Sequence, residues 1–321
     1  DTLPLAAMEA MQFGHALERI LCEILLNDPT FGPVHLIKLD ISDGFYQITI
    51  NINDIPKLGV IFPTPPGAEP LIAFPLVLPM GWTNSPPIFS TATETIADLA
   101  NIRINQMHQP LPHHLDELAQ SISSPPPAPP TDMSRLPAIA RDPSLPSSTK
   151  PLAYTDVFVD DFVAAAQQNA QMPTPPPALS PNTTTPLDNL RRIQRILLHA
   201  IDDVFRPLSP YDPPERREPV SLKKLRAGDC SWGTIKLVLG WIIDTETLTI
   251  RLPPHCIQRL AEILESIPRT QHRTSLKKWH AVLGELCSMS LALPGSQNIF
   301  STMQNALVQK TGARLITDDN P

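Results

Sequence analysis

Three aspartates interrupt apolar parts of the sequence, and they are the residues best suited to chemistry. Asp40 ends an apolar run over residues 34–39, and the adjacent Asp160 and Asp161 separate two further apolar runs. A carboxylate held beside a hydrophobic core is costly to leave unpaired. Divalent cations such as Mg²⁺ prefer oxygen ligands and often use one or two carboxylates together with substrate phosphates. Two such ions can hold the attacking and the leaving oxygen of a phosphoryl transfer.

Each aspartate also has an ordinary structural explanation. An Asp-Asp pair is common in a two-residue hairpin turn, because Asp side chains hydrogen-bond to nearby backbone. An Asp at the end of a strand can equally cap the segment that follows it. The carboxylates alone therefore do not decide between a metal site and turn chemistry.

Short apolar runs predict the strands that would position these aspartates. Residues 34–39 and 46–52 have strand patterns, and residues 155–159 and 162–166 flank the aspartate pair as the two arms of a β-hairpin. A second hairpin is predicted from residues 236–243 and 247–252, around Asp244-Thr245-Glu246. Strands mixed with helices, without a βαβ repeat, predict an α+β fold.

Helices are predicted where apolar residues recur at helical spacing. The first covers residues 6–26, and the second should begin near Asn84-Ser85 with Pro86 in its first turn. Three more follow. The apolar residues that define the later four helices are Phe89, Ala92, Ile96 and Leu99; Leu190, Ile193, Leu197, Ile201 and Val204; Ile257, Leu260 and Leu264; and Leu276, Trp279, Leu283 and Leu286.

The 39 prolines divide the chain into blocks, with clusters at residues 110–151, 173–186 and 207–219. Proline lacks the backbone N–H and disrupts helices and central strands. Such stretches indicate loops or disordered insertions. We therefore predict proline-rich insertions at 110–151 and 172–219, the second of which contains the amphipathic helix near residue 197.

Composition limits the class of protein. The chain is 42% hydrophobic and 18% charged, as in globular proteins, and it has neither a run long enough to span a membrane nor an export signal, so an intracellular location in the cytoplasm or nucleus is expected. Its four scattered cysteines argue against a disulfide framework or a zinc knuckle. The adjacent His113 and His114 are expected to be surface or loop residues. The net charge of −7 lacks the basic character usual in nucleic-acid-binding proteins, although basic residues concentrate late in the chain.

Four motifs, taken in order, resemble those of reverse transcriptases, the RNA-directed DNA polymerases of retroelements. They are the first aspartate motif in Leu39-Asp40-Ile41-Ser42-Asp43-Gly44-Phe45-Tyr46, an L-P-x-G-x-x-x-[SA]-P-x-x-F motif at residues 78–89, a Y-x-D-D box with Phe for Tyr in Phe158-Val159-Asp160-Asp161, and a primer-grip hairpin in Val238-Leu239-Gly240-Trp241. Residues 239–244 and 288–295 look most like enzymes of tyrosine-recombinase or long-terminal-repeat retrotransposons.

The resemblance implies a role for each matching residue. Asp40 and Asp160 would bind two Mg²⁺ ions, for which Mn²⁺ could substitute, with Asp161 as a third carboxylate. Phe45 would be a steric gate that excludes a ribose 2′-OH, so that the product is DNA. The remaining assignments are Ile41, Ser42, Asp43 and Gly44 beneath the triphosphate, Met80 and Gly81 beneath the incoming nucleotide, Lys223 or Lys224 near the pyrophosphate leaving group, and Gly240 and Trp241 at the primer end. Taken without the motifs, Phe45 would be a core aromatic residue and Trp241 a packing residue of the hairpin.

The implied architecture is a right-hand polymerase fold with an antiparallel palm sheet flanked by helices, truncated fingers and a helical thumb. Residues 1–47 would begin the palm and include a helix near the fingers, 48–84 would form a fingers segment, 85–245 the palm, and 246–321 the thumb or connection. The implied partners are an RNA or DNA template, a DNA primer and deoxynucleoside triphosphates.

Two alternatives remain after this comparison. The residues before Asp40 contain a single arginine, Arg19, and do not match the basic triphosphate contacts that the family takes from its finger strands. That difference favours a catalytically inactive relic that at most binds nucleic acid. A nuclease or an integrase would explain the aspartates, but not the motif at 78–89.

Overall fold

The computed structural model describes residues 13–121, 150–168, 188–207, 209–211, 217–267 and 275–289, together with 301, 304 and 305. These residues form two compact units that divide between residues 234 and 235. No helix among them is both long enough and apolar enough to cross a membrane.

The elements of the first unit, in which η marks a 3₁₀ turn, are η2 (Phe13–His15), α1 (Ala16–Leu26), η3 (Pro29–Phe31), β1 (Val34–Asp40), η4 (Gly44–Gln47), η5 (Ile55–Leu58), β2 (Val60–Ile61), β3 (Ile72–Ala73), α2 (Ser85–Asn105), α3 (Asp116–Ser121), β4 (Ala153–Phe158), β5 (Asp161–Gln167), α4 (Asn189–Phe205) and α5 (Leu222–Arg226).

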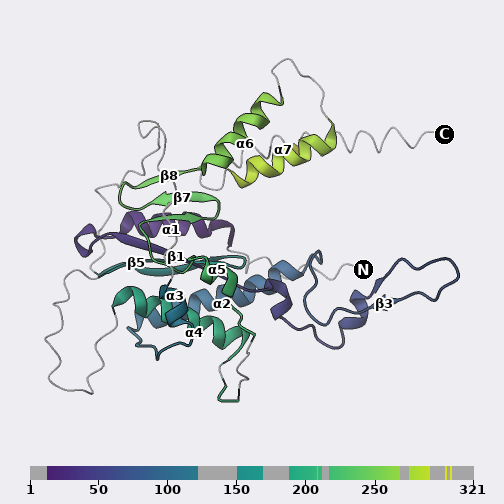
Figure 1. Cartoon of the computed structure of the whole chain (residues 1–321), viewed down its shortest axis with the longest axis horizontal. Coiled ribbons are helices and arrows are strands. Elements are labelled where there is room, and N and C mark those ends of the chain that lie inside the picture. Colours follow the sequence, from purple (N-terminus) through teal and green to yellow (C-terminus); the bar gives the residue numbers. More distant parts are fainter. Residues whose placement is uncertain are drawn as a thin grey trace. The chain divides into compact units, whose positions relative to one another are not determined.

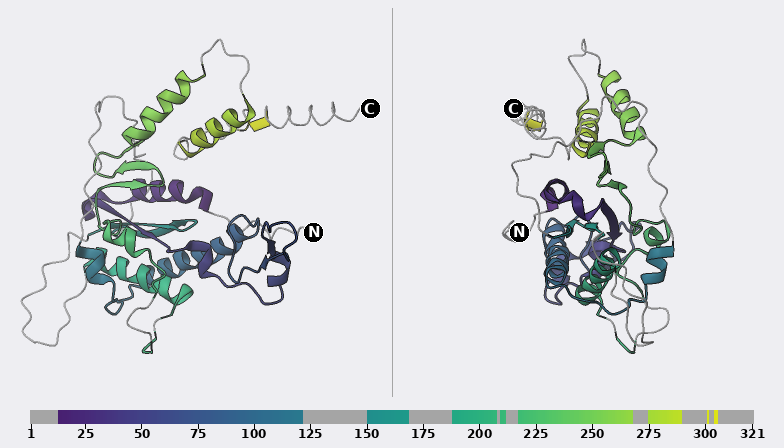
Figure 2. Two further views of the ribbon diagram at one scale, coloured as in Figure 1. Left: turned by 45° about the vertical axis from the view of Figure 1, so that its right-hand side comes forward. Right: turned by 90° about the vertical axis from the view of Figure 1, so that its left-hand side faces the viewer.

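An antiparallel sheet in the order β1-β5-β4 forms the centre of the first unit. In β5, every residue from 162 to 167 is buried, so this strand lies between two covered faces. Figures 1 and 2 show α1 on one face of the sheet and α2 with α4 on the other. The predicted strands at 34–39, 155–159 and 162–166 and the α+β class are confirmed, as are the helices at 85–105 and 189–205.

The core lies between the sheet and the pair α2 and α4. Phe89 and Ile96 of α2, Leu197 of α4 and Phe162 of β5 are fully buried in one hydrophobic cluster. Because side chains alternate along a strand, the residues next to the core positions of β1 and β5 point to the opposite face. Asp40 and Asp161, which are next to core residues, therefore lie on the face of the sheet opposite this core.

The free edge of β4 is closed by a side chain. The amide of Asn101, on α2, donates to the carbonyl of Thr155 at 2.8 Å and accepts from its N–H at 3.0 Å. This pair of hydrogen bonds takes the place of a neighbouring strand, which protects an edge that would otherwise be open to pairing.

A partly buried ion pair fixes α1 to the sheet. The Arg19 guanidinium donates to both carboxylate oxygens of Asp156, on β4, at 2.7 Å each. The Tyr154 hydroxyl also donates to this carboxylate, at 2.7 Å. Arg19 is therefore a structural residue of the sheet face.

The strand predicted at 46–52 is wrong. Asp43 has a left-handed backbone with φ 58°, and Gly44 follows with φ 28°, so the chain turns sharply after β1 and winds into the 3₁₀ turn η4. The Gln47 side chain stabilises this turn by donating to the Ser42 carbonyl at 2.7 Å. Beyond it, a single isolated bridge joins Thr49 to Val77.

The insertion predicted at 110–151 is partly wrong. Residues 110–121 are folded against α4 and contain the short helix α3, in which Asp116 forms an ion pair with Arg195 of α4. His113 is also buried, against expectation. Polar partners on α4 hold this segment despite its prolines. Residues 122–149 and 169–187 lie outside the described part of the chain, as do residues 6–12 of the first predicted helix.

The second unit contains β6 (Ile235–Val238), β7 (Trp241–Asp244), β8 (Thr249–Arg251), α6 (Pro254–Glu265) and α7 (Leu276–Ser288). The strand predicted at 236–243 is two strands, because Leu239 and Gly240 both have positive φ, 47° and 84°, as the type I′ hairpin turn requires. The next turn is where the sequence predicts it. The Asp244 side chain accepts there from the N–H groups of Glu246 and Thr247.

The two predicted helices of this unit are confirmed, and their predicted apolar faces are confirmed in part. The predicted Leu283 is buried, whereas the predicted Ile257, Leu264 and Leu276 are exposed. Each helix buries only those apolar residues that another element covers. The helical spacing of apolar residues in the sequence therefore does not show which of them are buried.

Removing the Arg19 guanidinium should destabilise the first unit. Arg19→Met leaves the Asp156 carboxylate, whose side chain is 5% exposed, without its cation, and we expect a loss of about 3 kcal/mol in the free energy of unfolding. Arg103→Met is the matched control, because its ion pair with Asp203 is partly exposed and should contribute less than about 1 kcal/mol. Urea unfolding of both variants measures the difference, and equal losses would contradict the structural role of Arg19.

Candidate functional site

Three carboxylates from distant parts of the sequence meet at one end of the central sheet. Asp40, the last residue of β1, is paired directly with Asp161, the first residue of β5. Residues opposite each other in an antiparallel pair share a face, so both side chains lie on the same side of the sheet. Asp160 precedes Asp161 in the hairpin turn, and its carbonyl accepts from the Ile41 N–H at 3.2 Å. One carboxylate oxygen from each of the three aspartates lies within 4.8 Å of the other two.

The turn that presents Asp160 has an unusual backbone. β4 ends at Phe158 and β5 begins at Asp161, so Val159 and Asp160 form the loop. Val159 adopts φ 57°, in the left-handed region that β-branched residues rarely occupy. Such local strain is concentrated at functional sites, where the surrounding structure maintains it.

Residues 219–221, which follow α4 in the sequence, pair with the end of β1 beside the three carboxylates. Ser221 donates its N–H to the Asp40 carbonyl at 2.8 Å, and the Ser42 N–H donates to the Pro219 carbonyl at 2.7 Å. Helix α5 begins at once, and its Lys224 ammonium lies 2.8 Å from Asp40 Oδ1 and 3.7 Å from Asp161 Oδ1. Lys223 is exposed and is not among the ion-pair partners of these aspartates in the described chain. The structure therefore distinguishes two lysines that the sequence does not.

The group is electrostatically unfavourable when it is fully ionised. Burial raises the pKa of the Asp40 carboxyl to about 6, with further contributions from the charges of Asp160 and Asp161 and an opposing effect of Lys224. The pKa of Asp160 is also raised, first by burial and then by the charge of Asp161. Perturbed carboxylates that share a site are typical of functional groups and need a cation to ionise together.

The donor set fits a hard divalent cation. All three side chains offer carboxylate oxygens, the ligands that Mg²⁺ prefers, and magnesium sites commonly use few protein ligands and leave positions for water and phosphate. Asp40, Asp160 and Asp161 would hold such an ion.

The loop that the sequence assigns to the triphosphate runs beside these carboxylates. Ile41 is buried, and a Cβ added to Gly44 would lie 3.9 Å from Asp160 Oδ2. Asp43 points to another partner and forms an ion pair with Arg217. Sequence reasoning did not assign Arg217; its only signal was membership of the basic cluster around residue 216.

Phe45, the predicted steric gate, is held by an aromatic contact. Its ring meets that of Phe89, on α2, edge to face, with centroids 5.0 Å apart and planes at 84°. Phe89 is fully buried. The half-buried ring of Phe45 is therefore held in place by its contact with the hydrophobic core.

Four other predicted residues are not part of the carboxylate group. Met80 is 68% exposed, and Gly81 has φ 89°, in the turn before α2. Gly240 and Trp241 belong to the second unit, where Gly240 forms the hairpin turn and Trp241 is buried. Burial of Trp241 agrees with a packing role in its hairpin, and its role at a primer end stays a prediction.

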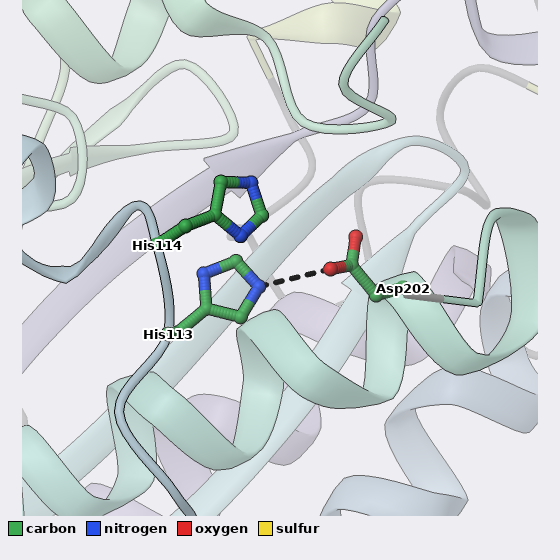
Figure 3. A group of neighbouring side chains, drawn as sticks. All are labelled: His113, His114 and Asp202. Carbon is green, nitrogen blue, oxygen red and sulfur yellow. Dashed lines mark hydrogen bonds and ion pairs between the residues drawn. The ribbon is translucent and has the colours of Figure 1, made fainter. Parts of the chain in front are cut away.

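A second group of possible metal ligands is made of His113, His114 and Asp202 (Figure 3). The Leu115 N–H donates to His113 Nδ1 at 3.1 Å, so the ring proton is on Nε2, which donates to Asp202 at 2.9 Å. Both ring nitrogens of His113 are then in use, and neither has a free lone pair for a metal. We conclude that this group anchors the segment before α3 to α4.

Comparisons with known proteins show a likeness to solved structures. No protein-family model matches the sequence, and no curated protein matches it. Among solved structures, the chain is similar to a foamy viral protease-reverse transcriptase in complex with double-stranded DNA, at 15% sequence identity and a TM-score of 0.40. The match covers 96% of this chain and 35% of that chain, so this chain spans about a third of the other.

The raised pKa of Asp40 predicts how stability depends on pH. A carboxyl whose pKa is near 3.8 when unfolded and about 6 when folded binds its proton more tightly in the folded state. The metal-free protein should therefore lose stability as the pH rises through this window. Asp40→Asn should remove the loss and be on the order of 1–2 kcal/mol more stable than wild type above the window.

Urea unfolding in the presence of a chelator, below and above the window, measures this effect. Below it the two proteins should be equally stable, because a protonated Asp and an Asn are both neutral. A constant difference at both pH values would show that the charge of Asp40 is not responsible.

Proposed function

We propose that this chain is an RNA-directed DNA polymerase, the reverse transcriptase of a retroelement. It would transfer nucleotides to a primer 3′-OH with two divalent ions. The observation that carries the proposal is the convergence of Asp40, Asp160 and Asp161, whose carboxylate oxygens lie within 4.8 Å of one another. The motif resemblance assigns the metal ions to the same three residues. Such chemistry depends on positioning and charge neutralisation, which divalent ions held by the three aspartates would supply.

In this proposal each element belongs to the palm, the fingers or the thumb of a right-hand polymerase fold. The sheet β1-β5-β4 with α2 and α4 is the palm, the segment with the β2–β3 hairpin belongs to the fingers, and α6 and α7 belong to the thumb. The proposed partners are a primed RNA or DNA template and deoxynucleoside triphosphates. The origin from a retrotransposon of the tyrosine-recombinase or long-terminal-repeat type is part of the proposal, and it rests on the sequence motifs alone.

The alternatives predict different behaviour. An inactive relic would have no use for strained backbone at Val159 or for the desolvated carboxylates of Asp40 and Asp160, both of which reduce the stability of the fold. A nuclease could use the same ions, but it would cleave nucleic acid and would not extend a primer.

Asp160→Asn should abolish primer extension on an RNA template. The substitution removes a charged metal ligand, and because Asp160 has a raised pKa through burial, the neutral Asn should not destabilise the metal-free fold. Incorporation of labelled deoxynucleotides, with Mg²⁺ or with chelator, measures the activity. Asp203→Asn is the control, since this carboxylate is exposed on α4 and paired with Arg103; it should extend normally. Extension that persists in Asp160→Asn would exclude the proposed site.

Phe45→Ala should allow the protein to incorporate ribonucleotides. The ring, fixed by Phe89, is proposed to fill the space that a 2′-OH needs. Its loss should raise the ratio of ribonucleotide to deoxynucleotide incorporation by roughly ten- to a hundredfold. Single-nucleotide kinetics with both sugars measure the ratio, and Phe62→Ala, an exposed aromatic of the fingers segment, is the control. Unchanged sugar selectivity would show that Phe45 is only a core residue.

A further inference from the structure

The structure places one ammonium group among the three carboxylates. Lys224 Nζ lies 2.8 Å from Asp40 Oδ1 and 3.7 Å from Asp161 Oδ1. The first contact is a charge-assisted hydrogen bond. It occupies one oxygen of a carboxylate that is proposed to bind a divalent ion, so the lysine and the ion compete for the same side chain.

The backbone of this lysine is fixed, whereas its side chain is able to move. Ser221 binds the Asp40 carbonyl through its N–H, and its hydroxyl caps α5 by accepting from the Lys224 N–H. The start of the helix is thereby attached to the end of β1. The Lys224 side chain is 46% exposed, compared with 11% for Asp40. A long, flexible and half-exposed side chain can leave a carboxylate without disturbing the helix that carries it.

We propose that Lys224 is the counter-ion of the metal-free site and that a divalent ion displaces it. This inference rests on the proposed metal-binding role of the three aspartates. In the metal-free protein the ammonium offsets the repulsion among them, which holds the ends of β1 and β5 together. When the ion binds, it takes over this role, and repulsion between the two cations releases the ammonium to solvent.

Lysine labelling of the wild-type protein tests the displacement directly. An amine-acylating reagent is applied with and without Mg²⁺, and modified peptides are quantified by mass spectrometry with fragment ions that separate Lys223 from Lys224. Modification of Lys224 should increase severalfold when Mg²⁺ is added, while modification of Lys223, which is exposed in either state, should not change. Equal labelling of Lys224 in both conditions would overturn the proposal.

Metal affinity tests the competition. Calorimetric titration of Mn²⁺ at a pH above the Asp40 titration should give a dissociation constant roughly two- to fivefold lower for Lys224→Met than for wild type, as expected for losing one partly exposed charge pair. Lys223→Met, one residue away on the same short helix, should bind as wild type does. Lys224→Arg keeps the positive charge and should restore the wild-type affinity.

The outcomes separate this inference from the proposed function. If wild type binds Mn²⁺ and Asp160→Asn does not, but Lys224→Met binds no more tightly than wild type, the counter-ion role is overturned and the metal site stands. If wild type binds no Mn²⁺, both are overturned. Tighter binding by Lys224→Met that Lys224→Arg reverses supports the competition, and a merely structural role of Lys224 would not produce it.

Discussion

The antiparallel pairing of β1 with β5 is the constraint on which the candidate site depends. It sets Asp40 directly opposite Asp161 and brings the Asp160 carbonyl to the Ile41 N–H. A slip of one residue would move every side chain of a strand to the other face. The apolar residues of both strands that face α2 and α4 prevent such a slip, so the packing of the core determines where the carboxylates meet.

Several features of the candidate site reduce the stability of the fold and are not needed to form a three-stranded antiparallel sheet. Burial and mutual repulsion raise the pKa of Asp40 and of Asp160, and Val159 holds a left-handed backbone. The compensating interactions lie outside the site. The Arg19–Asp156 ion pair fixes α1 to the sheet, and the buried helices α2 and α4 support its other face. Destabilised carboxylates on a well-supported scaffold are typical of a group selected for binding charge.

Much of the fold could be predicted from the sequence, because the elements that make the core follow regular patterns. The hairpin at 153–167 and the helices at 85–105 and 189–205 have apolar residues at the spacing of their secondary structure. The 3₁₀ turn after β1 could not be predicted, since it depends on the left-handed conformation of Asp43. Nor could the distinction between Lys223 and Lys224, which depends on where α5 begins relative to Asp40. The position of the segment that contains His113 could not be predicted either, because its polar partners lie on α4 and no spacing in the sequence links them to it.

The pairing of residues 219–221 with the end of β1 has a consequence for the order of folding. The carboxylate group is completed by segments from three distant parts of the chain, and contacts between remote segments form slowly because closing long loops costs entropy. Helices such as α2 need only local contacts and can form early. During synthesis, therefore, both strands and their three aspartates emerge before the segment at 219–221, which joins the end of β1 last.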